Sequence, residues 1–315
     1  MSYPACFDNH GPGLVYSPRM GTLNILINPH AGGGRAARLV PVLQERVRAH
    51  ATPGALCVAD SVPQALDWLR ALPRGATVAL VGGDGTVNQM LPALLDNALC
   101  MALIPQGSGN DVARAIGVYG MPWQHALQLA QTATPRPMDV GWLHTDTLQR
   151  PFLSSLTVGF DSAVGYRALI GPRWLRGLPR YLLATLRELS ALQTWDMQVT
   201  LDGVPLHQGS TLFASTLNTP TYGSGMPAVP AARIDDGALD VLVAGEFNAL
   251  QTLAMLPRLL AARHLSHPRV QTRRFQHMAI ASAQALPLAT DGEYIGAANA
   301  LTVQVAPAAL QVLCK

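Results

Sequence analysis

The first 120 residues alternate between short, continuous apolar runs and stretches with the spacing of a helix. The apolar runs are bounded by Gly, Pro or Asn and predict buried strands at residues 23–27, 77–81 and 101–104, with a weaker one at 56–59. Helical spacing between them covers residues 36–50, 62–72, 86–95 and 110–116. Pro41 is expected to delay or kink the first of these helices. Strands that alternate with helices predict a parallel sheet, whose ligands bind beyond the carboxyl ends of the strands.

From about Met138 the pattern changes to strands separated by turns. The predicted strands are residues 138–143, 152–160, 197–201, 211–217, 238–243, 277–282 and 301–305. Two helical stretches, 180–193 and 249–262, interrupt them, and residues 134–137 form a short linker that contains proline. The expected fold class is therefore α/β plus β-sandwich, with an N-terminal parallel-sheet domain and a C-terminal mainly-β domain.

Length and composition fit two compact units. The chain has 315 residues, about half of them hydrophobic, and 13% charged residues against a usual level of about 25%. No apolar run approaches the ~20 residues of a transmembrane helix, and residues 1–20 resemble a disordered leader more than a signal peptide. We expect a cytoplasmic protein. The net charge of +3 is too small to indicate nucleic acid and suits peripheral contact with an anionic membrane. The scattered cysteines Cys6, Cys57, Cys100 and Cys314 predict neither disulfides nor a zinc site.

Three glycine-rich turns follow the predicted strands of the first domain. They are Asn28-Pro29-His30-Ala31-Gly32-Gly33-Gly34, Gly82-Gly83-Asp84-Gly85-Thr86-Val87-Asn88 and Pro105-Gln106-Gly107-Ser108-Gly109-Asn110-Asp111. Glycine lets backbone amides approach a phosphate, so three such turns at one sheet edge predict a polyphosphate site. The only lysine is Lys315, which excludes a P-loop, and the first turn lacks the GxGxxG spacing of a Rossmann dehydrogenase.

These residues carry a resemblance to a known family. Gly82-Gly83-Asp84-Gly85-Thr86 is similar to the GGDGT signature of diacylglycerol kinases, sphingosine kinases and NAD kinases. Asn28-Pro29 and the element from Gly107 to Arg114 resemble the lipid-kinase branch, as do the later Asp139-Val140-Gly141, Asp235-Asp236-Gly237 and Asp291-Gly292-Glu293. The motifs run in family order over nearly the whole chain, which therefore resembles the bacterial diacylglycerol kinase catalytic family.

The resemblance implies an ATP- and magnesium-dependent lipid kinase with its active site in the cleft between two domains, 21–137 (with about 306–315) and 138–305. It implies three catalytic carboxylates: Glu293 as general base, Asp291 as its support and Asp84 near the γ-phosphate and magnesium. The implied nucleotide-binding residues are Asn28, Gly82, Gly83, Asp84, Gly85, Thr86, Val87, Asn88, Gly107, Ser108, Asn110 and Asp111. A second, structural magnesium is implied at Asp236 and the carbonyls of Arg233 and Ala238, with Asp139 linked through water. The final segment is expected to return to the first domain.

Other interpretations remain open from the sequence. Asp291-Gly292-Glu293 and Asp235-Asp236-Gly237 are also ordinary turn sequences. GGDGT is often followed by Asn-Glu, whereas here the pair is Asn88-Gln89, which affects the expected magnesium coordination. The acceptor is expected to be diacylglycerol or a related lipid at a membrane surface, and a homodimer is compatible with the resemblance. The alternatives are a soluble kinase of the NAD kinase type, which is not expected to carry the Asn110-Asp111 element, and a non-catalytic nucleotide or lipid sensor.

Overall fold

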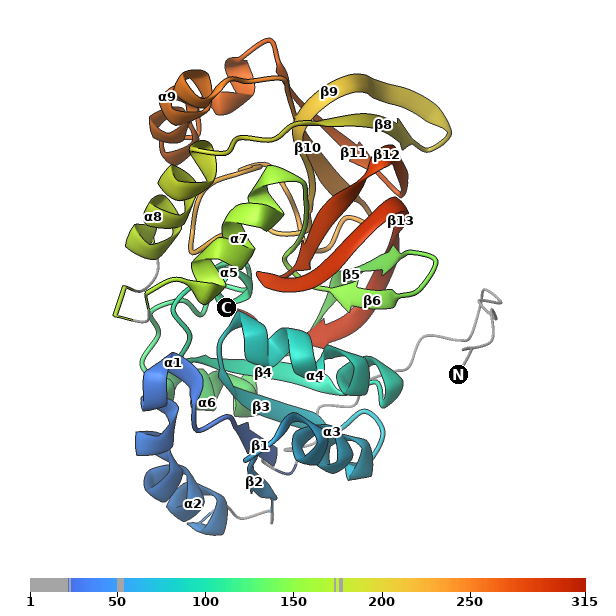
Figure 1. The fold of residues 1–315 in the computed structure, drawn as a ribbon. Helices are drawn as coiled ribbons and strands as arrows, with labels where there is room; N and C mark the ends of the chain where they lie inside the picture. Colours follow the sequence, from blue (N-terminus) through green and yellow to red (C-terminus); the bar gives the residue numbers. More distant parts are fainter. Residues whose placement is uncertain (1–21, 23, 50–53, 173, 176–177) are drawn as a thin grey trace.

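The computed structural model describes residues 22, 24–49, 54–172, 174–175 and 178–315, and the predicted leader lies outside them. The chain folds into an α/β part followed by a β-rich part (Figure 1), so the predicted fold class is confirmed. Across the described ranges, no helix has the length and apolar character needed to span a membrane.

The first part is built on four parallel strands in the spatial order β4-β3-β1-β2. These strands are β1 (Asn24–Ile27), β2 (Leu56–Val58), β3 (Thr77–Gly82) and β4 (Cys100–Pro105). Its helices are α1 (Ala31–Gly34), the 3-10 helix η1 (Ala36–Leu39), α2 (Val40–Ala49), α3 (Val62–Ala71), α4 (Asp84–Asp96), α5 (Asp111–Ala115) and α6 (Trp123–Thr132). Pro41 lies in the first turn of α2, after the 3-10 turn, where a proline is tolerated.

Both faces of this sheet are buried, which explains why its strands are continuous apolar runs. On β3, Val78 and Leu80 face a core that contains Leu69 of α3 and Leu91 of α4. The alternate residues of β3, such as Val81, face a second core that is closed by α2 and α6. The layers hold the three glycine-rich turns at the carboxyl ends of β1, β3 and β4.

The second part is antiparallel and closes on itself, because β9 and β12 each pair with both β7 and β8. Its strands are β5 (Arg136–His144), β6 (Gln149–Phe152), β7 (Ser155–Val158), β8 (Trp195–Leu201), β9 (Val204–Leu217), β10 (Leu239–Gly245), β11 (Val270–Phe275), β12 (His277–Thr290) and β13 (Glu293–Val312). Its helices are α7 (Phe160–Ile170), α8 (Leu178–Leu189), α9 (Ala249–Leu260) and the short η2 (His264–Ser266). Helices α7, α8 and α9 lie along one side of the strands (Figure 1).

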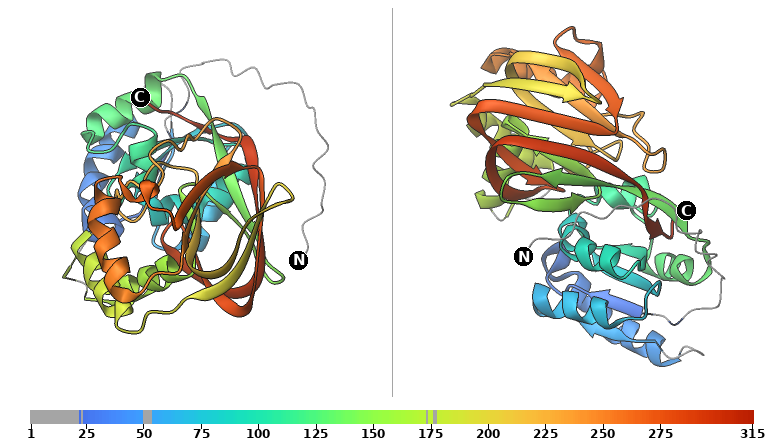
Figure 2. Two further views of the ribbon diagram at one scale, coloured as in Figure 1. Left: turned by 90° about the horizontal axis from the view of Figure 1, so that it is seen from above. Right: turned by 90° about the vertical axis from the view of Figure 1, so that its right-hand side faces the viewer.

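Strand β13 runs from the second part into the first (Figure 2). It leaves β12, pairs with β5, and ends parallel to β4, with Gln311 beside Cys100 and Val312 beside Met101. Leu313 then packs into the core beneath the first sheet. The two parts are thus joined by one hydrogen-bonded sheet.

Three features differ from the pattern-based expectation. Helix α6 and strand β11 were not expected, and the predicted strand at residues 152–160 is divided between β6, β7 and the start of α7. The division occurs because Gly159 has φ +90°, a left-handed conformation that ends the strand, and helix α7 begins at the next residue.

Candidate active site

The three glycine-rich turns meet at the carboxyl edge of the parallel strands. A Cβ on Gly83 would lie 2.6 Å from the Cα of Gly107, so the second and third turns pack backbone against backbone. The first turn joins them through Asn28, whose Nδ2 donates to Oγ1 of Thr86 at 2.9 Å. The turns therefore form one surface on which glycine is required by close approach.

Arg35 crosses the third turn and was not foreseen from the sequence. Its Nη2 donates to the carbonyl oxygens of Gln106 and Gly107 at 3.1 and 3.2 Å, and its Nε donates to Gly32. In a chain whose only lysine is at its end, this exposed guanidinium is a positive charge beside the turns. The position of Arg35 directly after Gly32-Gly33-Gly34 was the sequence signal that could have identified it as part of the site.

The side chain of Asn110 lies against Gly83 and Gly107 with one polar atom unpaired. Oδ1 of Asn110 is buried without a hydrogen-bond partner within the described part of the chain, and a Cβ on Gly107 would approach that oxygen to 2.5 Å. The Nδ2 of Asn110 donates to the carbonyl of Gly107 at 2.9 Å, which fixes the amide orientation. A buried acceptor left free beside glycine backbone suits a ligand that carries hydrogen-bond donors, such as a nucleotide base or ribose.

Asp84, the first residue of α4, links the second turn to the third. Its carboxylate accepts from the backbone N–H groups of Asp111 and Val112, both at 3.1 Å. Burial, followed by the charge of Asp111, raises the pKa of Asp84 to about 7, although the two backbone hydrogen bonds oppose the shift. A buried carboxylate of this kind is stabilised in its charged form by a nearby cation.

Asp111 connects this cluster to the β-rich part. Its two oxygens accept from the Thr221 hydroxyl at 2.7 Å and from the N–H groups of Ser224 and Gly225 at 3.0 and 2.9 Å. The loop after β9 is therefore held against the third turn. Sequence reasoning did not identify this loop, since its contacts lie more than 100 residues away.

Glu293 reaches the second turn from the other part of the molecule. It follows the two-residue hairpin turn of Asp291 and Gly292, which have φ values of +49° and +85°. A Cβ on Gly85 would lie 2.9 Å from Oε1 of Glu293. Asp291-Gly292-Glu293 therefore does form a turn, and this turn also places Glu293 against Gly85, at the start of α4.

Asp291 is a buried acceptor for four donors. Its carboxylate accepts from the N–H groups of Leu153, Ser154 and Ser155 at 2.7–3.0 Å and from Nδ2 of Asn88 at 2.8 Å. Burial raises the pKa of Asp291, and the hydrogen bonds, led by the Asn88 amide, oppose this. Asp291 therefore fixes the hairpin turn, and with it Glu293, against α4.

Two of the expected nucleotide-binding residues point elsewhere. Asn88 donates to Asp291 and accepts from Nη2 of Arg150 at 2.6 Å, and Val87 is fully buried in the core between α4 and the sheet. Their side chains therefore serve the joint between the two parts and the core. No signal in the local sequence identified Arg150 as a partner of Asn88.

The carboxylates near Glu293 have the chemistry of a magnesium site. The charges of Asp111 and Asp291 lie close enough to Asp84 to raise its pKa, and within the described residues none of the three forms an ion pair. Hard carboxylate oxygens suit magnesium. No group of three His, Cys, Asp or Glu side chains forms a complete metal site in the described ranges, so a magnesium here would need phosphate oxygens as further ligands.

The residues expected to hold a structural magnesium already have protein partners. Oδ2 of Asp236 lies 2.7 Å from Nη2 of Arg274. Both oxygens of Asp139 accept backbone N–H groups, from Gly237 at 2.7 Å and Ala308 at 2.8 Å. These carboxylates connect the loop at 233–238, which contains Arg233 and Ala238, to β5, β11 and β13. The carboxylates as they stand fit a structural link and not an open metal site.

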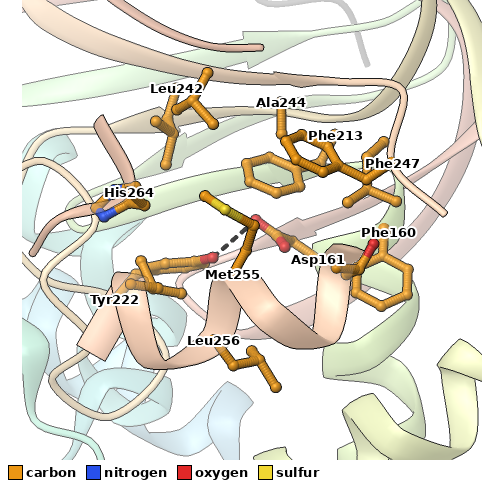
Figure 3. Close-up of a pocket in the computed structure, with 14 residues that line it drawn as sticks. Phe160, Asp161, Phe213, Tyr222, Leu242, Ala244, Phe247, Met255, Leu256 and His264 are labelled. Carbon is orange, nitrogen blue, oxygen red and sulfur yellow. Dashed lines mark hydrogen bonds between the residues drawn. The ribbon is translucent and has the colours of Figure 1, made fainter. Parts of the chain in front are cut away.

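An opening beside the acidic cluster leads towards apolar cavities in the β-rich part. It encloses about 530 Å³ of space, part of it open to solvent, and its lining includes Ser108, Ser224 and Gly292 from the cluster and Tyr181 and Leu169 from α8 and α7. Tyr181 also lines a cavity that encloses about 440 Å³, part of it open to solvent, and this cavity adjoins a second one of about 540 Å³, also partly open to solvent. Figure 3 shows the lining of the second cavity.

Two family models together match almost all of the chain. The model described as diacylglycerol kinase catalytic domain matches residues 22–143. The model described as YegS C-terminal NAD kinase beta sandwich-like domain matches residues 154–314.

Relatives with assigned names agree with these matches. The chain is 29% identical over 304 residues to a diacylglycerol kinase of Mycobacterium tuberculosis (strain ATCC 25618 / H37Rv), covering 96% of this chain and 97% of that one. It is 33% identical over 234 residues to a protein of Pseudomonas putida named "Probable lipid kinase YegS-like", covering 73% and 74%. A crystal structure of a diacylglycerol kinase from Bacillus anthracis str. Sterne superposes with a TM-score of 0.68 at 18% identity, over 93% of this chain and 97% of that one, and shows the same fold.

Proposed function

This chain belongs to the family of diacylglycerol kinases and YegS-like lipid kinases, and we propose that it transfers the γ-phosphoryl group of ATP to the hydroxyl of diacylglycerol or a related lipid. Lipid phosphorylation by a kinase is the family activity, whereas ATP with magnesium and the identity of the lipid are our proposals. The observation that carries the proposal is the placement of Glu293 against Gly85, at the start of α4.

The three turns are the proposed ATP site. The N-terminus of α4 presents free backbone N–H groups at Asp84 and Gly85, and such amides bind phosphate well. Arg35 adds a positive charge beside Gly107, and the free Oδ1 of Asn110 suits a donor on the nucleoside. Magnesium, bound by Asp84 together with the phosphates, would neutralise charge on the transferred group.

Glu293 is the proposed general base. A carboxylate within hydrogen-bond reach of the lipid hydroxyl accepts its proton as the oxygen attacks the γ-phosphorus, and ADP leaves. Asp291 acts on Glu293 by fixing the hairpin turn, since its own oxygens are occupied by four donors. We therefore assign Asp291 a positioning role, and Glu293 the chemical one.

We also propose that the enzyme works at a membrane surface. Leu169, which lines the opening, and its chain neighbours Ile170 and Trp174 are 53, 65 and 80% exposed, and Arg180 also lines the opening. Exposed apolar and aromatic side chains together with arginine favour the interface of an anionic bilayer. The division into domains at 21–137 with 306–315 and 138–305, and the homodimer allowed by the resemblance, remain proposals.

The test is transfer of labelled γ-phosphate to lipids in mixed micelles by the wild type and by Glu293→Gln. The panel contains diacylglycerol, monoacylglycerol, sphingosine and ceramide, with NAD as a soluble acceptor because the second family model is NAD kinase-like. We expect a labelled lipid with the wild type, its loss with Glu293→Gln, and ATP affinity retained. Labelled NADP without labelled lipid would establish the soluble alternative. ATP binding without transfer to any acceptor would favour a sensor.

A further inference from the structure

Two adjacent apolar cavities lie between helices α7, α8 and α9 and the strands of the β-rich part. Figure 3 shows one of them, the inner cavity. The inner cavity encloses about 540 Å³, part of it open to solvent, and is lined by residues such as Phe213, Phe247 and Met255. The outer cavity encloses about 440 Å³, also partly open to solvent, and is lined by residues such as Val164 and Tyr181. The two share five lining residues, namely Phe160, Asp161, Tyr222, Leu256 and Leu259. They are therefore neighbours separated only by these side chains.

Tyr181 separates the outer cavity from the opening beside the candidate active site. This residue lines both the outer cavity and the opening that contains Ser108 and Gly292. Burial and then the charges of Asp111, Asp161, Asp84 and Glu293 raise the pKa of Tyr181 to about 12, so these carboxylates all lie near its side chain. A chain that starts at Glu293 and enters the protein would pass Tyr181 and then Asp161.

Asp161 places a carboxylate in an apolar cavity wall, where a charged group is costly unless it accepts hydrogen bonds. Its Oδ2 accepts from the hydroxyls of Tyr222 at 2.9 Å and Ser215 at 3.2 Å, while for Oδ1 the described residues supply no hydrogen-bond donor. The side chain keeps partial accessibility, since it lines both cavities. The hydroxyls of Tyr222 and Ser215 need only a neutral acceptor, which an amide or a hydroxyl side chain at position 161 would also provide. The charge of a carboxylate is therefore not required by these internal hydrogen bonds.

We propose that Asp161 is a specificity-determining residue that accepts a hydrogen bond from a second polar group of the acceptor lipid, a hydroxyl or an amine beyond the hydroxyl that is phosphorylated. The proposal rests on the lipid kinase function and deepens it, since it defines the class of acceptor. An ester carbonyl only accepts hydrogen bonds and so cannot donate one to the carboxylate of Asp161, whereas a hydroxyl or an amine can. The donor could belong to the headgroup region or to the hydrocarbon chain.

The experiment compares one pair of acceptors that differ only in a hydrogen-bond donor, and adds two acceptors with other donors. Dioleoylglycerol is compared with the diacylglycerol that carries ricinoleoyl chains, which differ by a chain hydroxyl. Monoacylglycerol and sphingosine supply a headgroup hydroxyl and an amine. For each acceptor, kcat/KM is measured with the wild type and with Asp161→Asn, which keeps size and an acceptor for the Tyr222 hydroxyl but removes the charge.

We expect the wild type to prefer at least one donor-bearing acceptor, and Asp161→Asn to reduce that preference about 10-fold or more, as is typical for a hydrogen bond to a charged group. For dioleoylglycerol, kcat/KM should differ by less than about 3-fold between the wild type and Asp161→Asn. The acceptor that loses its advantage identifies the donor. An unchanged preference, or an equal loss for all acceptors, would overturn the proposal.

Tyr222→Phe separates the carboxylate from its internal hydrogen bond. This variant removes the Tyr222 donor but leaves Asp161 charged, so we expect the preference to persist. Loss of the preference in both variants would assign it to the Tyr222–Asp161 contact and would contradict our proposal.

A second pair of variants tests whether the lipid chain passes Asp161 at all. Met255→Trp narrows the inner cavity, and Ala254→Trp places the same side chain on an exposed position of the same helix. We expect only Met255→Trp to lower kcat/KM for long-chain acceptors relative to short ones. Identical chain-length profiles would show that the chain does not reach the inner cavity. If the wild type phosphorylates no lipid, the proposed function itself fails; transfer without the expected selectivity contradicts this inference alone.

Discussion

A single added carbon on Gly85 would lie 2.9 Å from Oε1 of Glu293, although the two residues are more than 200 positions apart in the chain. Gly85 lies in the first turn of α4, in the α/β part, and Glu293 opens β13, in the β-rich part. The contact brings a carboxylate from one part to the phosphate-binding turn of the other. Several of the predictions below concern how this contact is maintained.

The first prediction is that Gly85→Ala reduces transfer while the fold persists. The methyl group would meet the end of a flexible glutamate side chain, which can move, and no backbone stands in its way. A shift of about 1 Å in a catalytic group costs on the order of 100-fold in rate. We expect kcat to fall by about that factor, with ATP affinity and the melting temperature close to those of the wild type.

The shorter carboxylate of Glu293→Asp provides the control for Gly85→Ala. If crowding causes the loss, Gly85→Ala should cost much less activity in the Glu293→Asp background than in the wild type. Strictly multiplicative losses in the double variant would show that Gly85 acts in some other way, since independent sites have additive free energies.

The second prediction concerns Asp291→Asn. Asparagine tolerates the left-handed backbone at this position, where φ is +49°, so the turn itself should form. However, its NH₂ group must replace one oxygen that accepts hydrogen bonds from buried donors. We expect the free energy of unfolding to fall by about 1–3 kcal/mol and the activity to fall with it.

Denaturant unfolding and phosphate transfer measure the two effects of Asp291→Asn. Asp235→Asn is the matched control, because Asp235 is an exposed aspartate in another turn. A stable Asp291→Asn protein with full activity would contradict the role of Asp291 in holding Glu293.

The sequence predicts those parts of the site that depend on local chemistry. Strands followed by glycine-rich turns place Gly83, Gly107 and Asn28 at one edge, because all parallel strands end there. The contacts of Asp291 with Asn88 and the backbone at 153–155 have no such local sign. These contacts depend on how the α/β part packs against the β-rich part. Neither the spacing of hydrophobic residues nor the turn sequences predict that packing.

Apolar composition alone also misassigned one element. Residues 152–160 combine apolar residues with Ser154, Ser155 and Thr157, a pattern that is compatible with a strand and with the start of a buried helix. Gly159 with φ +90° decides between them in the structure, and α7 follows. Asp161 was overlooked for the same reason, because its position in a cavity wall depends on α7 being a helix.

The third prediction is a pH dependence of stability that arises from Asp161. Burial raises the pKa of this carboxyl to about 6, while the hydroxyls of Tyr222 and Ser215 lower it in part. The folded protein therefore holds the proton more tightly than the unfolded chain, whose aspartates titrate near pH 4. This contribution to stability is complete below about pH 4 and is lost as the pH rises through about 6.

Asp161→Asn should remove that dependence. Chemical unfolding at several pH values between 4 and 7 compares the two proteins, and the difference in the free energy of unfolding should shift in favour of Asp161→Asn as the pH rises. A difference that is constant across this range would show that the carboxyl titrates normally in the folded protein.

The fourth prediction distinguishes an ion pair from a metal site at Asp236. Nη2 of Arg274 lies 2.7 Å from Oδ2 of Asp236, so the guanidinium competes with a divalent cation for this carboxylate. If the carboxylate and nearby carbonyls do bind magnesium, Arg274→Gln should strengthen binding. Magnesium should then raise the melting temperature of Arg274→Gln more than that of the wild type, by mass action.

The double variant Arg274→Gln/Asp236→Asn isolates this site from any magnesium bound at Asp84. It should lose the additional stabilisation and keep whatever the wild type gains, because the acidic cluster at Asp84 is unchanged. Equal magnesium responses in all three proteins would leave Asp236 as the partner of Arg274, with the loop at 233–238 held by that pair and by Asp139. That outcome would restrict metal chemistry in this enzyme to the cluster beside Glu293, where hard oxygen ligands have no competing protein cation among the described residues.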